Sequence, residues 1–299
     1  MEMKIFSLTA SVLIASALSL SAGISLTVPT DDWTAIQLGE RTDYPDDEQA
    51  KKTGGDIVGD ESGNQAGFFR KYDRGAATGI SDDELGYRIR LGDDTSSHIF
   101  VGLDIGANGS SPNGKLDMFI HANIGNNNPK QDEISFFDAG DGLNNSPDTS
   151  TVGNEIPFKD GRDQDFAKYE DLSPVSESND SYLAANPDDA GTDLNGDGKN
   201  DFFLSFKVSM QKFNDAYLEF FPDNESLTEN TLMSQTLMTS TNKNNFNQDF
   251  GGLDESFVSN QTWTDLGAGS EPEAVPEGAA SAMIFGLLGF SFVLVCRRK

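Results

Sequence analysis

The segment DLNGDGKNDFFLSFKVSM, residues 193–210, decides the predicted fold because it runs from an oxygen-rich loop directly into a patterned strand. Every even position from 202 to 210 is apolar, and these residues alternate with Ser205, Lys207 and Ser209. This period of two is typical of a β-strand with one buried face. The segment therefore predicts a strand that begins where the loop ends.

The loop half places oxygen atoms at alternate positions around a glycine, Gly198. Calcium takes about six to eight oxygen ligands, which short side chains on a curled loop can supply. A chain rich in Asp, Asn and Gly also forms such turns without a metal, but five positions in register favour Ca²⁺. The twelfth position of an EF-hand is a glutamate and here is Leu204, so the loop is not an EF-hand. The predicted ligands are the side chains of Asp193, Asn195, Asp197 and Asp201 and the backbone carbonyl of Lys199.

A second stretch resembles this loop. The sequence NGKLDMFI at 113–120 repeats the pattern of DGKNDFFL at 197–204, and Asp104 and Asn108 precede it. Duplication of one loop-into-strand unit and convergence on similar turn chemistry both explain the match.

The composition is strongly acidic and rich in phenylalanine. The chain of 299 residues has 49 acids, 21 bases and a net charge of −28, which excludes nucleic acid as a partner because phosphates would be repelled. Twenty-one phenylalanines among many Asp, Asn, Gly, Ser and Thr residues indicate a β-rich extracellular protein. The single cysteine, Cys296, leaves the body without disulfides, so metal ions are the expected substitute.

Several other stretches have strand character. In LGYRIRL, residues 85–91, the odd positions are expected to face the core, with Arg88 and Arg90 facing out. Further strands are predicted at 98–105, 116–122, 134–138 and 217–221, whereas 139–200 and 232–247 are read as polar connections. The predicted class is all-β: an antiparallel, jelly-roll-like β-sandwich over residues 24–266 with long polar loops.

Residues 1–23 read as a secretory signal peptide. Lys4 precedes an apolar run that ends at Leu20, and small residues follow it. This order predicts cleavage near Ala22 or Gly23.

The other end of the chain reads as a sorting segment. A flexible spacer is predicted at 267–277, followed by an apolar helix and a basic end within 278–299. This order resembles the PEP-CTERM sorting signal of Gram-negative bacteria, although Gly278 replaces the usual second proline. The resemblance implies an exosortase-type membrane protease as partner, with the helix as a transient inner-membrane anchor; a retained single-pass anchor is the alternative. The matching residues are Val275, Pro276, Glu277, Arg297, Arg298 and Lys299.

No catalytic motif stands out, so the chain is not expected to be an enzyme. The two histidines, His98 and His121, lie in predicted strands and are interpreted as strand-face residues. Paired carboxylates could serve a glycosidase, but no single pair can be chosen among so many acids.

The sequence thus predicts an exported, calcium-stabilised cell-surface or extracellular-matrix protein with a structural or adhesive role. A carbohydrate-binding, lectin-like module is the alternative, with surface polysaccharide as partner, and a glycoside-active enzyme is the weaker one. Aromatic side chains exposed in a row on one sheet face would favour sugar binding.

Overall fold

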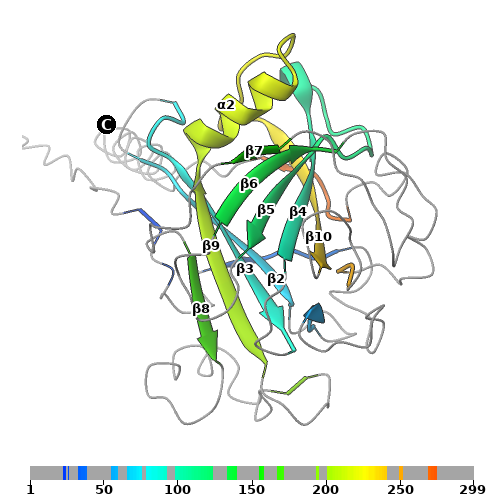
Figure 1. Cartoon of the computed structure of the whole chain (residues 1–299). Helices are drawn as coiled ribbons and strands as arrows, with labels where there is room; N and C mark the ends of the chain where they lie inside the picture. Colours follow the sequence, from blue (N-terminus) through cyan, green and yellow to red (C-terminus); the bar gives the residue numbers. More distant parts are fainter. Residues whose placement is uncertain are drawn as a thin grey trace, which may run out of the picture.

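The computed structural model describes the greater part of a two-sheet body (Figure 1). All structural statements below concern the described residues, which are 23–24, 26, 33–38, 55–59, 66–75, 79–92, 98–123, 133–139, 155–157, 167–171, 193–194, 201–240, 249–251 and 269–274.

The first sheet has five antiparallel strands in the order β1–β2–β3–β9–β8. The predicted strand after the acidic loop is β9, and it lies between β3 and β8. The strands are β1 (Thr34–Ala35), β2 (Phe68–Asp73), β3 (Glu84–Leu91), β9 (Phe202–Ser209) and β8 (Ala167–Asp171).

The second sheet has six antiparallel strands in the order β11–β10–β4–β5–β6–β7. Consecutive strands from β4 to β7 are neighbours, which makes this part a meander (Figure 1). The strands are β11 (Glu273–Ala274), β10 (Leu232–Ser240), β4 (His98–Ile105), β5 (Met118–Asn123), β6 (Glu133–Asp138) and β7 (Glu155–Pro157), with a short 3-10 helix η3 (Ala107–Gly109) after β4.

Both sheets contribute to one apolar core. In the first sheet the ring of Tyr87 lies 5.6 Å from the rings of both Phe68 and Phe206. The same buried cluster includes Ile120 and Leu237 of the second sheet. The prediction of a β protein built from antiparallel sheets is confirmed.

Helix α2 (Met210–Phe220) corrects the prediction of a strand at 217–221. The Ser209 side chain caps the helix by accepting the backbone N–H of Lys212 at 3.5 Å. From Met210 onward the buried residues follow a helical spacing, with Phe213 and Tyr217 on the inner face. The aromatic run at 217–221 has a strand-like composition, but the helical spacing of the buried residues before it extends into it.

Strand β10 (Leu232–Ser240) corrects the interpretation of 232–247 as a polar connection. It pairs with β4 along eight residues and lies inside the second sheet. Its Ser, Thr and Gln side chains are almost all buried. Hydrogen bonds to both neighbouring strands stabilise this segment as a strand despite its polar composition.

The arginines of β3 correct a second expectation, because Arg88 and Arg90 are both buried. They do lie on the outer face of the first sheet, but that face is covered. Arg88 donates from Nη2 to the carbonyl of Leu26 at 2.9 Å, and its guanidinium lies 4.5 Å from the Trp33 ring centroid. Residues near the start of the chain therefore form a second, smaller core on this face.

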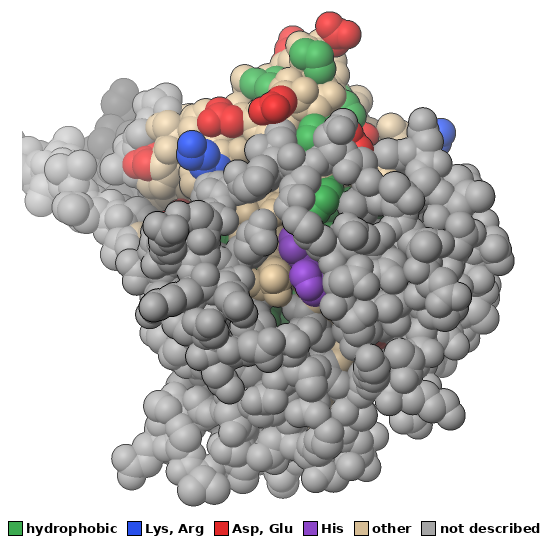
Figure 2. Space-filling model, viewed as in Figure 1, with side chains coloured by type: hydrophobic (Ala, Val, Ile, Leu, Met, Phe, Trp, Pro, Cys, Tyr) green, Lys and Arg blue, Asp and Glu red, His purple; other side chains and the backbone are tan. Residues whose placement is uncertain are grey.

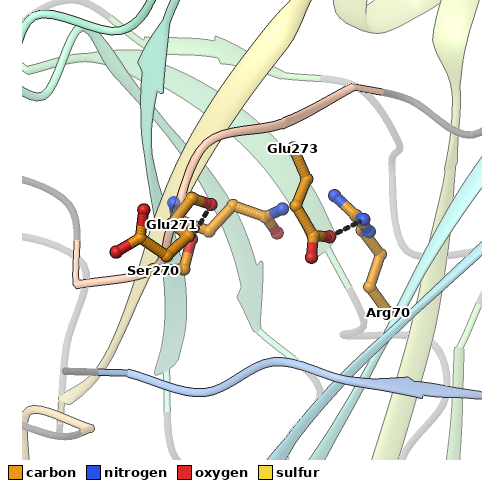
Figure 3. Close-up of polar contacts among 5 residues, drawn as sticks. Arg70, Ser270, Glu271 and Glu273 are labelled. Carbon is orange, nitrogen blue, oxygen red and sulfur yellow. Dashed lines mark hydrogen bonds and ion pairs between the residues drawn. The ribbon is translucent and has the colours of Figure 1, made fainter. Parts of the chain in front are cut away.

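An ion pair joins the two sheets (Figure 3). Arg70 of β2 is buried and pairs with Glu273 of β11. The backbone N–H of Gln235 in β10 donates to Ser270 Oγ at 2.8 Å, and Ser270 N–H returns a bond to the Gln235 carbonyl at 2.9 Å. Residues 269–274 of the predicted spacer are thus bonded to the body.

No helix of the described part of the chain is long and apolar enough to cross a membrane. The leader before Gly23 and the sorting motif with its apolar tail, 275–299, lie outside the described residues. These two predictions therefore stay predictions.

Candidate functional site

The predicted calcium loop ends at a fully buried carboxylate, Asp201. Its Oδ2 atom accepts from Arg90 Nε at 2.8 Å and from Arg90 Nη2 at 2.6 Å. The backbone N–H of Leu194 donates to the same oxygen at 3.1 Å. The Oδ1 atom of Asp201 is buried and accepts no hydrogen bond.

Asp193, the first predicted ligand, lies beside Asp201. Its Oδ1 atom is also buried, and its negative charge acts on the Asp201 carboxyl. The structure thus brings the first and the last predicted ligands together. The other predicted ligands, Asn195, Asp197 and Lys199, lie outside the described residues.

The environment of Asp201 opposes its negative charge. The pKa of Asp201 is raised to about 6, mainly by burial and also by the charge of Asp193, against the lowering effects of Arg90 and the Leu194 amide. A cation near Oδ1 would offset the cost of burial, although the Arg90 guanidinium already neutralises part of the charge. With a pKa of about 6, Asp201 is mostly ionised at neutral pH, so Asp193 and Asp201 place two carboxylates side by side before β9. No cluster of three or more metal-binding side chains occurs among the residues with defined positions.

The related stretch at 104–117 shares one contact with the described ends of the 193–201 loop. The backbone N–H of Ile105 donates to Asp117 Oδ2 at 2.7 Å, as Leu194 does to Asp201. In both places an aspartate directly before a strand accepts the amide that follows an earlier aspartate, Asp104 or Asp193. The two stretches therefore share this one contact between a backbone amide and the aspartate before a strand.

Backbone amides close the turn in this first copy. The Asp104 carboxylate accepts the N–H groups of Asn113 at 3.0 Å and Gly114 at 2.5 Å. Gly114 has φ +84, a left-handed conformation that glycine adopts at low cost. Here Asp104 closes the turn at Asn113 and Gly114, with both of its carboxylate oxygens bonded to the backbone.

Replacing Asp117 with Asn should stabilise the protein at neutral pH. Burial raises the pKa of Asp117 to about 6, with Asp104 adding to the effect. Because the folded state holds this proton more tightly than the unfolded state, the ionised carboxylate costs stability above about pH 6, and the cost disappears as the pH falls to about 4. Thermal melting at pH 7.5 should show a gain of about 1–2 kcal/mol after allowance for solvent screening, and almost none at pH 4.

The exposed Asp223 provides the control for that test, since Asp223→Asn changes the net charge equally. It should leave the melting temperature nearly unchanged at both pH values. Equal shifts in the two variants would show a general charge effect and would rule out a local cost at Asp117.

A histidine pair lies on the outer face of the second sheet, and histidine side chains are visible in purple in Figure 2. His98 Nδ1 is 2.8 Å from His121 Nε2, and the two ring planes differ by 7°. One of these two nitrogens must carry a hydrogen and donate it, and the other must accept it. Both side chains are on a strand face, as predicted.

The aromatic residues on this face are buried. Phe100, Phe119 and Phe137 pack together, with ring centroids of Phe100 6.2 Å from Phe119 and 6.1 Å from Phe137. They form a third apolar cluster and not an exposed row. Their arrangement is that of a core.

A cavity of about 180 Å³ lies between η3 and the loop that joins α2 to β10. Its polar lining includes Asn108, Glu225, Thr228 and Asn230, and the almost fully buried Tyr217 also borders it. Asn108 has φ 54, and its Oδ1 accepts the Glu225 N–H at 2.8 Å. Sequence reasoning missed this cavity because its walls come from segments about a hundred positions apart.

The chain matches no protein-family model, no curated protein and no solved structure.

Proposed function

We propose that the chain is an exported cell-surface or extracellular-matrix protein with a calcium-stabilised β-sandwich and a structural or adhesive role. The observation that carries the calcium part is the buried Oδ1 atom of Asp201, which lies beside Asp193 and accepts no hydrogen bond. Leaving a buried acceptor unsatisfied costs about 1–3 kcal/mol, and a bound cation would recover that cost. The high negative charge also suits an environment that supplies divalent cations.

The proposed route to the surface uses the two chain ends. The leader directs export, and an exosortase-type protease removes the apolar helix within 278–299 after binding the motif at 275–277. Strand β11 supports this role, since it is paired to β10 and ends at Ala274, directly before the motif. The motif would then emerge from the edge of a folded body.

The finer architecture belongs to the same proposal. We propose that the two sheets face each other as a β-sandwich of the jelly-roll type. The shared core of the two sheets supports the sandwich.

Processing gives the direct test of the sorting proposal. Mass spectrometry of surface-exposed material should find no peptides beyond about residue 277, and Pro276→Ala or Glu277→Ala should leave the protein in the membrane fraction. Intact peptides that contain Arg297–Lys299 in surface material would contradict removal of the tail.

Calcium should raise the melting temperature of the mature protein through the 193–201 loop. Without a glutamate at position twelve, the dissociation constant is expected at about 10⁻⁴–10⁻³ M. At calcium ten times that value, mass action gives roughly 1.4 kcal/mol, or about 3–5 °C. Asp197→Ala should abolish the response seen between EDTA and millimolar calcium, and an equal response in both proteins would show that the loop is only a turn.

The 180 Å³ cavity favours one alternative, a carbohydrate-binding role. The hydroxyl, amide and carboxylate groups that line it are suited to hydrogen bonds with a sugar ring. A glycan array with the mature protein and with Asn230→Ala would test this role: binding that the substitution removes would support it.

A further inference from the structure

The backbone nitrogen of Ile24 lies against a carboxylate. Its N–H donates to Glu84 Oε2 at 2.6 Å, across sixty positions of sequence. The Ile24 side chain is 3% exposed and packs in the cluster that covers the outer face of the first sheet. This point of the chain is therefore fixed to the body by both its backbone and its side chain.

Glu84 is placed to hold a positive charge. It is the first residue of β3, and the Lys207 Nζ atom of β9 lies 3.0 Å from the same Oε2 atom. The Glu84 side chain is 26% exposed, so the carboxylate is only partly accessible to water. A charge-assisted bond at such a site is stronger than one at an open surface.

The leader sequence has a cleavage pattern at the same point. Signal peptides are cleaved after a small-x-small sequence, with small residues at the third and first positions before the cut. Cleavage after Gly23 places Ser21 and Gly23 at these positions, whereas cleavage after Ala22 places Leu20 at the third. The pattern favours a mature chain that begins at Ile24.

We propose that the mature protein begins at Ile24 and that its new α-ammonium group forms an ion pair with Glu84. Cleavage breaks the Gly23–Ile24 peptide bond with one water molecule, leaving a carboxyl group on Gly23 and an amine on Ile24. The amine takes up a proton at neutral pH, since the α-amino pKa is about 7.7–8.0. This inference rests on the proposed export of the chain.

The space around Glu84 suits an ammonium group. Gly23 has φ +77, and a Cβ atom on it would lie 2.9 Å from Glu84 Oε2. Removal of Gly23 opens the space beside the carboxylate, and the nitrogen gains two further hydrogen atoms that can point there. Downstream, the Leu26 carbonyl accepts from Arg88 Nη2 at 2.9 Å and holds the new terminus in place.

Cleavage must precede folding, because the buried Ile24 is inaccessible to a protease in the folded body. The same event that releases the chain from its leader would then supply the charge that completes the smaller core. Processing and folding would be coupled through one carboxylate.

The first test determines the N-terminus. The full precursor would be expressed in a Gram-negative host, and the exported product examined by intact mass and N-terminal sequencing. A product that begins at Ile24 supports the inference. A product cut elsewhere overturns the inference but leaves export intact, whereas an uncleaved product in the cytoplasm overturns the proposed export itself.

The second test isolates the ion pair with a double-mutant cycle on the exported protein. One precursor carries Glu84→Gln, and another carries one glutamine inserted between Gly23 and Ile24; cleavage after Gly23 then leaves the ammonium one residue away from Ile24, and glutamine before the cut does not create a new small-x-small site. Glu84→Gln should lower the melting temperature by about 3–6 °C in the native precursor product and clearly less in the insertion product. Lys207→Met serves as control for the other partner of Glu84, and its cost should be the same in both backgrounds. Equal costs of Glu84→Gln in both backgrounds would overturn the pairing.

Discussion

Replacing Arg90 with Met should lower the free energy of unfolding by about 3–5 kcal/mol, because it leaves the buried Asp201 carboxylate without its guanidinium partner. For a body of this size, such a loss corresponds to a fall of about 6–20 °C in melting temperature. Thermal or urea unfolding in EDTA would measure the effect without a contribution from calcium. The substitution preserves most of the side-chain volume, so packing changes are small.

The double variant Arg90→Met with Asp201→Leu is the matched control. It removes both charges together, and apolar replacement of a buried pair is often neutral or stabilising. The double variant should therefore regain most of the loss. A single variant with a loss below about 1 kcal/mol would show that Asp201 does not need the guanidinium in the folded state.

The burial of the Arg90–Asp201 pair could not be predicted from alternation along one strand. The period of two in β3 correctly separates the inner face at Tyr87 from the outer face at Arg90. It does not reveal that the outer face is covered, because the covering residues Leu26 and Trp33 lie about sixty positions earlier. A sheet face becomes a core through contacts that are distant in the sequence.

Strand β9 and helix α2 show where local pattern is sufficient and where it fails. The alternation from Phe202 predicts the strand, and the structure ends that strand at Ser209. The following residues continue the alternation only as far as Met210, and Ser209 then caps a helix. The cap signal is present in the sequence, but the aromatic run at its end suggested a strand.

Some features of the candidate sites also follow from local sequence spacing, and others depend on the order of the strands. The relation between Asp193 and Asp201 follows from spacing within nine residues, and the structure brings these two side chains together. The Arg90 partner, the His98–His121 hydrogen bond and the cavity beside Asn108 all depend on which strands become neighbours. Strand order was not readable from one sequence, so these features could not be predicted.

Replacing Phe206 with Ala should cost about 3–5 kcal/mol, again a fall of about 6–20 °C in melting temperature. Phe206 is fully buried in β9, and its ring lies 5.6 Å from that of its cross-strand neighbour Tyr87. Truncation removes apolar burial and leaves a cavity between the two sheets, where neighbouring rings cannot collapse fully. Phe206→Leu keeps most of the volume and should cost clearly less.

Tyr87→Phe is the informative comparison, because it should raise the stability. The Tyr87 ring stacks on Phe68 within the core, and its hydroxyl oxygen is buried without a hydrogen-bond partner. Removing that hydroxyl keeps the ring contacts and removes an unsatisfied polar group, for an expected gain of about 1 kcal/mol or 2–4 °C. A loss of stability in Tyr87→Phe would mean that the hydroxyl is bonded in the folded protein. In that event the loss in Phe206→Ala would include a disturbed hydrogen bond as well as a cavity.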